Sequence, residues 1–85
     1  MKNEWLITFR SVTFAQRGER VLHSRGIQCA MQRTPKQLTE RGCGYCLRLR
    51  DGDVRKAVEI LRREKLSYEK VYAVSDDGIT EEWIL

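Results

Sequence analysis

The stretch IQCAMQRTPKQLTERGCGYCLRL, residues 27–49, is the most informative about the fold, because it holds two strand patterns with no helix between them. Residues 27–32 and 44–49 each alternate between two sets of side chains, as half-buried strands do. The polar run between them, residues 33–43, contains the only proline and predicts a loop. The side chains expected on the buried faces of the two strands are Ile27, Cys29, Met31, Tyr45, Leu47 and Leu49.

A helical pattern flanks this stretch on each side. The first helix is expected to follow the N-cap Ser11 and to end near Arg25. Gly18 falls on its apolar face, where the missing side chain would let the helix approach a sheet closely. The second helix can be capped by Asp51 or Asp53. The residues predicted to face the sheet are Phe14, Gly18, Leu22, Val54, Val58 and Leu61.

Two further strand patterns complete the order of elements. They are EWLITF at residues 4–9 and YEKVYAVS at residues 68–75. The order is then βαββαβ, the split βαβ pattern of a ferredoxin-like α+β sandwich. This predicts a four-stranded antiparallel sheet with both helices on one face, and with the first and third strands in the centre.

The 85 residues, 41% hydrophobic and 33% charged, are typical of one soluble domain. We expect that domain over residues 1–78, followed by a short tail over residues 79–85. In the tail, Trp83 and Leu85 should pack against the domain or against a neighbouring copy. Packing against a copy would make the protein a homo-oligomer. No apolar run is long enough for a membrane span, and the first residues lack the apolar core of a signal peptide. The expected location is therefore the cytoplasm, where a structural disulfide is rare.

Positive charge gathers in the middle of the chain. The net charge is +4, and residues 10–50 hold nine basic side chains against two acidic ones, Glu19 and Glu40. The tail from Asp76 onward carries acidic residues and no basic one. A molecule polarised in this way attracts anions or the acidic surface of another protein.

Cys43 and Cys46 have the spacing of a CxxC motif. An extended chain rises about 3.3 Å per residue, which would place them about 10 Å apart. A disulfide needs α-carbons within about 7 Å, so a redox pair requires a turn at Gly42 or Gly44. Two thiols also supply only half of the ligands that zinc takes, and His23 is expected on the surface rather than as a ligand. A thiolate metal carrier of the copper type stays open as an alternative.

The sequence around Cys43 favours a single reactive thiol over one half of a redox pair. The residue ends a loop between two glycines, and Arg33, Lys36 and Arg41 would favour its thiolate. The competing interpretation is an inert cysteine in a solvated basic loop. Cys29, which alternates with apolar residues, is expected to be a buried small hydrophobe.

Thr34, Pro35 and Lys36, followed by Cys43 and Gly44, resemble the motif of a small bacterial domain family described as selenium/sulfur carrier protein-like. That motif reads Thr-Pro-Arg, then small polar residues, then Cys-Gly, and the resemblance covers about residues 4 to 75. Here a lysine stands for the arginine, the linker is bulkier, and a second cysteine follows the motif.

The resemblance implies a carrier rather than a catalyst, with no cofactor or metal. Cys43 would be the carrier thiol, receiving sulfur or selenium from a donor protein's persulfide and passing it to an acceptor protein. Thr34 and Pro35 would shape the loop, and Gly44 would allow close backbone approach. Cys46 would be an accessory thiol, reachable on the open sheet face beside Arg48. The basic side chains of Arg33, Lys36 and Arg41 would stabilise the negative charge of the persulfide.

A basic nucleic-acid-binding domain is the alternative of another class. RNA-recognition domains share this order of elements, and the chain contains eleven arginines that invite phosphate contacts. Such domains stack bases on aromatic side chains of their central strands. The third strand offers only Tyr45, on the face expected to be buried, so the carrier is the preferred hypothesis.

Overall fold

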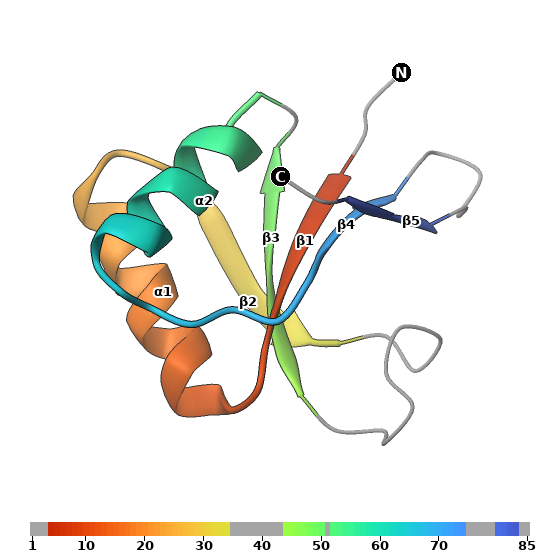
Figure 1. Cartoon of the computed structure of the whole chain (residues 1–85), viewed down its shortest axis with the longest axis horizontal. Coiled ribbons are helices and arrows are strands. Elements are labelled where there is room, and N and C mark those ends of the chain that lie inside the picture. The colour runs from red at the N-terminus through yellow and green to blue at the C-terminus, as the bar shows by residue number, and fades with distance from the viewer. Residues whose placement is uncertain (1–3, 35–43, 51, 75–79, 84–85) are drawn as a thin grey trace.

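A computed structural model of the chain describes residues 4–34, 44–50, 52–74 and 80–83. In chain order the elements are β1 (Glu4–Phe9), α1 (Val12–Ser24), β2 (Cys29–Arg33), β3 (Tyr45–Arg50), α2 (Val54–Arg63), β4 (Val71–Val74) and β5 (Thr80–Trp83). The first six follow the predicted βαββαβ order. Both helices lie on the same side of the sheet (Figure 1).

The strands form one antiparallel sheet in the order β2-β3-β1-β4-β5. Each helix therefore carries the chain across one strand, α1 from β1 to β2 over β3, and α2 from β3 to β4 over β1. This is the ferredoxin-like arrangement. The fold prediction is confirmed for its four strands, with β1 and β3 inside the sheet.

Strand β5 was not predicted from the sequence. It pairs with β4 from Val71 opposite Trp83 to Val74 opposite Thr80. Part of the segment expected to be a short tail thus extends the sheet by one strand. The side chain of Trp83 and all of Leu85, which were expected to pack against the domain or a copy, lie outside the described residues.

Helix α1 begins where the sequence predicts. Ser11 adopts the extended backbone of an N-cap, and its Oγ accepts a hydrogen bond of 3.4 Å from the backbone N–H of Phe14. The residues of α1 that are buried against the sheet are Ala15, Gly18 and Leu22.

The prediction that Phe14 faces the sheet is wrong, because its side chain is 37% exposed. The reason lies beneath Gly18, where the ring of Phe9 already fills the space under the helix. A Cβ added at Gly18 would come within 2.9 Å of Phe9 Cζ. The helix therefore turns its smallest residues, Ala15 and Gly18, toward the sheet, and Phe14 points to the side.

Helix α2 buries the residues expected from its apolar spacing, which are Val54, Ala57, Val58 and Leu61. Asp53 occupies the N-cap position, but its side chain makes no capping hydrogen bond. Asp51, the other predicted cap, lies outside the described residues. Within the part of the chain that the structure describes, no helix is long and apolar enough to cross a membrane.

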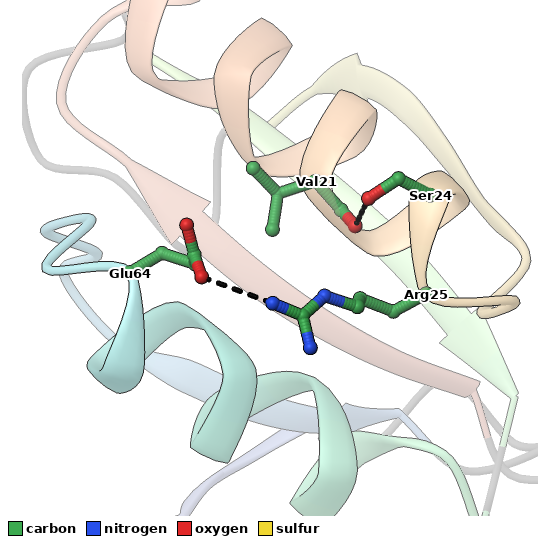
Figure 2. Close-up of polar contacts among 4 residues, drawn as sticks. All are labelled: Val21, Ser24, Arg25 and Glu64. Carbon is green, nitrogen blue, oxygen red and sulfur yellow. Dashed lines mark hydrogen bonds and ion pairs between the residues drawn. The ribbon is translucent and has the colours of Figure 1, made fainter.

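One exposed ion pair joins the ends of the two helices. Arg25 follows α1 and reaches Glu64, which follows α2, with 3.1 Å between Nη2 and Oε2 (Figure 2). In the last turn of α1 the hydroxyl of Ser24 donates to the carbonyl of Val21 at 2.6 Å. An exposed pair of this kind contributes at most about 1 kcal/mol, so buried packing holds the helices in place.

Two side chains of α1 bond to the backbone of edge strand β2. Glu19 Oε2 accepts from the N–H of Met31 at 3.2 Å, and His23 Nε2 donates to the carbonyl of Cys29 at 2.9 Å. Both backbone groups lie on the side of β2 away from β3. The exposed His23 thus has a structural partner in the strand.

Candidate functional site

The loop expected to carry the reactive thiol has a defined stem. Arg33 of β2 pairs with Tyr45 of β3, and the backbone N–H of Thr34 donates to the carbonyl of Gly44 at 3.2 Å. The sheet ladder therefore continues one step beyond the two strands. This bond holds Thr34 and Gly44, the two described residues that flank positions 35–43, next to each other.

The backbone conformation at position 44 requires a glycine. Its φ is +133°, a region that residues with a side chain rarely adopt. A Cβ at this position would meet the carbonyl oxygen of Phe9 at 3.5 Å and Thr34 Oγ1 at 3.6 Å, which is ordinary contact. The glycine is therefore needed for its torsion angle, and it sets the direction in which the chain enters β3.

Cys46 lies on the sheet face away from the helices, since its neighbour Leu47 belongs to the core under them. Its partners across the sheet are Thr8 of β1 and Gln32 of β2. The Cys46 side chain is 0% exposed. The expectation that this thiol is reachable is thus contradicted, while its accessory role remains a prediction.

Burial raises the pKa of the Cys46 thiol above its ordinary value. The nearby polar side chains of Thr34 and Gln32, and the charge of Arg48, act in the opposite direction without cancelling the effect. Because the thiolate is the nucleophile, a raised pKa and full burial both reduce reactivity. In this conformation Cys46 is a poor candidate for receiving sulfur directly.

The hydroxyl of Thr34 is buried and has no hydrogen-bond partner of standard geometry. It lies close enough to Cys46 to favour the thiolate, but the approach falls short of a full hydrogen bond. The hydroxyl of Thr8 differs, since it donates to the carbonyl of Lys70 at 3.2 Å and accepts from the same residue's N–H at 3.0 Å. An unsatisfied hydroxyl at the loop stem is an energetic cost that the fold does not explain.

Cys29 is half-buried and packs against the core on the helix side of the sheet. Cys29 thus lies on the apolar side of the strand as predicted, but it is only partly buried, whereas the prediction was a buried side chain. Burial, followed by the negative charge of Glu19, raises the pKa of Cys29 to about 11. Cys29 and Cys46 are both free thiols and face opposite sides of the sheet.

The predicted site residues divide between the stem and the segment it carries. The structure brings Arg33, Thr34 and Gly44 together, and the Arg33 side chain is exposed. The remaining predicted site residues, which lie outside the described residues, are Pro35, Lys36, Arg41 and Cys43. Reasoning from the sequence missed Thr8 and Gln32, although strand alternation with a fixed register would have placed both beside Cys46.

The described residues give little support to nucleic-acid binding or metal binding, the two alternatives that the sequence left open. The open face of β1 and β3 carries no aromatic side chain, because Trp5 and Phe9 are buried on the helix side. A platform for base stacking is therefore missing from these two central strands. Within the described ranges, no three histidine, cysteine or acidic side chains gather as metal ligands would.

Residues 4–73 match the sequence family described as "Putative Se/S carrier protein-like". The match covers both helices, strands β1 to β3 and most of β4, together with the stem and residues 35–43. Neither the curated proteins nor the solved structures gave a match to this chain.

Proposed function

This chain belongs to the Se/S carrier protein-like family, and we propose that it carries a sulfur or selenium atom on Cys43. The family match is the observation that carries the proposal. The role is that of a relay between two proteins, a donor and an acceptor, and not of a catalyst that releases a product. The residues of the loop, Thr34, Pro35 and Gly44, would set where the thiol stands.

The properties of the other two thiols support the choice of Cys43. Cys46 is fully buried with a raised pKa, and the pKa of Cys29 is about 11. Neither provides much thiolate near neutral pH. Cys43 lies in the sequence between Thr34 and Gly44, which are joined by a backbone hydrogen bond.

Positive charge near the thiol supports the same role. Arg33 is exposed at the stem, and Lys36 and Arg41 are close to Cys43 in the sequence. Cations near a thiol lower its pKa and would also stabilise the negative charge of a persulfide. Cys46 would serve as an accessory thiol only after a change that uncovers it.

The transfer needs no oxidant or reductant. The Cys43 thiolate attacks the terminal sulfur of the donor's persulfide, a new S–S bond forms, and the donor's S–S bond breaks. The donor cysteine leaves as a thiolate, and Cys43 now holds the persulfide. An acceptor nucleophile then attacks the outer sulfur, and Cys43 leaves as a thiolate. The basic side chains expected to lower the pKa of Cys43 would also make it a better leaving group in this second step.

The proposal is tested by loading the reduced protein with a cysteine desulfurase and cysteine. Intact-mass analysis should show one added sulfur on the wild type and on Cys46→Ser, and none on Cys43→Ser. Cys29→Ser serves as the matched control and should load normally. If the added sulfur follows Cys46, the family motif has been placed on the wrong residue. If no cysteine loads and Cys43 alkylates slowly at neutral pH, the residue is an inert loop cysteine.

A further inference from the structure

Two large apolar side chains are exposed in the first turn of α1. Val12 is 36% exposed and Phe14 is 37% exposed, and neither belongs to the core cluster. The packing of Ala15 and Gly18 on the sheet explains why Phe14 points to the side. Phe14 thus presents part of an aromatic ring to solvent in the same helical turn as Val12.

Unpaired basic side chains stand next to these apolar ones. Arg10 precedes the N-cap Ser11, and Arg17 lies one turn after Phe14 on the same side of α1. Both arginines are exposed. Among the described residues, neither belongs to an ion pair, whereas such pairs are made by Arg25, Arg48 and Lys70.

This part of the surface lies at the same end of the molecule as the loop stem. Phe9, the last residue of β1, is opposite Tyr45, and Tyr45 is opposite Arg33. Because Arg10 follows Phe9 directly, the start of α1 and the stem share one end of the sheet (Figure 1). The segment that contains Cys43 is attached at that end.

We propose that this end of the molecule docks the protein that hands sulfur to Cys43. The docking surface, called here the α1-start surface, consists of Arg10, Val12, Phe14, Arg17 and Arg33. The inference rests on the proposed carrier function and adds the chemistry of the partner to it. The partner should present acidic side chains around an apolar contact, which match the arginines and Phe14.

The composition of the α1-start surface favours a protein over a nucleic acid. Aromatic and arginine side chains provide most of the binding energy at protein interfaces. Opposite charges on the two partners also increase the rate at which they meet. A phosphate backbone would use Arg10 and Arg17 but would gain little from Val12 and Phe14.

The test compares two sulfur donors of different size. One is a persulfidated cysteine desulfurase with acidic residues around its active cysteine, and the other is sodium polysulfide, which needs no docking. The initial rate of Cys43 loading is measured for the wild type, Phe14→Ser and Arg17→Glu. Arg55→Glu, which makes the same charge change on the exposed side of α2, is the matched control.

With the desulfurase, Arg17→Glu should load about tenfold more slowly at low salt, and the difference should shrink at high salt. Phe14→Ser should also load about tenfold more slowly, with little dependence on salt. Both variants should load normally with polysulfide, and Arg55→Glu should be normal with both donors.

Several results would overturn the docking surface. They are desulfurase rates that do not change in Phe14→Ser and Arg17→Glu, and an equal loss of rate in Arg55→Glu. Tight, salt-dependent binding of a mixed-sequence oligonucleotide that Arg17→Glu abolishes would reassign the surface to nucleic acid. In each of these cases Cys43 can still load, so the carrier function survives. If neither donor loads Cys43, the carrier function itself fails, and the docking surface with it.

Discussion

Both faces of the sheet are buried near its centre, but the buried side chains on the two faces are of different kinds. The face under the helices is an apolar core that includes Ile7, Leu47 and Val71. On the opposite face, Leu6 is 3% exposed, Thr8 is 7% exposed, and Cys46 is fully buried. Burial on the first face follows from apolar periodicity, whereas burial on the second includes polar groups whose hydrogen bonds decide its cost. A sheet face that no helix covers can therefore still be buried.

The strongest test of this comparison is a large-to-small change on the helix face. Leu47→Ala should lower the free energy of unfolding by about 2–5 kcal/mol, because it leaves a cavity in the core. Arg48→Ala, the next residue on the opposite face, is exposed and should change stability by about 0.5 kcal/mol or less. Urea denaturation measures both. Similar losses in the two variants would mean that the faces do not differ in this way.

A second test concerns the contact between α1 and the sheet. Gly18→Val should cost about 1–3 kcal/mol, because the added side chain collides with the ring of Phe9. Phe9→Leu should relieve the collision, so the double variant should be more stable than the sum of the two single effects predicts. Thermal or urea unfolding of the four proteins gives the coupling. Simple additivity would show that the helix does not rest on that ring.

A third test separates the two threonines of the open face. Thr8→Val should lower stability by about 1–2 kcal/mol, because it removes the two hydrogen bonds that the Thr8 hydroxyl makes to the Lys70 backbone. Thr34→Val should be neutral or stabilising by up to about 1 kcal/mol, since it removes a buried hydroxyl without a partner. If Thr34→Val is the more harmful change, the hydroxyl has a structural role.

The smallest effect concerns the thiols on the two faces. The pKa of Cys29 is raised from 9.0 to about 11, so the folded state favours the protonated thiol. Its contribution to stability is therefore complete below about pH 9 and is lost as the pH rises through about 11. The wild type should lose slightly more stability than Cys29→Ala over that range.

The same thiols can be compared by alkylation. The rate at Cys29 should rise with pH toward a midpoint near 11, while Cys46 should react only when the protein unfolds. Peptide mass analysis after timed alkylation distinguishes the two sites. Rapid labelling of Cys46 in the folded protein would mean that the open face opens readily.

Much of the fold was predictable because strand alternation and helix spacing each repeat over several residues. The face that α1 turns to the sheet was not predictable. Apolar residues at helical spacing can be counted from Phe14 or from Ala15, and the position of the Phe9 ring determines which set is buried. Strand β5 was missed because its pairing with β4 is made by backbone bonds that no side-chain pattern reports.

The candidate site was predictable in part. Thr34 and Gly44 were predicted as loop-shaping residues, and the structure joins them by a backbone hydrogen bond. The burial of Cys46 could not be foreseen, because alternation gives the face on which a side chain lies but not what surrounds it there. Cys43 remains a prediction from the family motif.

The bonds from α1 to the outer side of β2 also limit how copies of this chain can join. A strand from another copy that paired with β2 would have to displace both Glu19 and His23 from Met31 and Cys29. Strand addition should therefore begin at the other edge, on β5. An assembly that can grow from only one edge closes after two copies, edge against identical edge, instead of extending as a fibre.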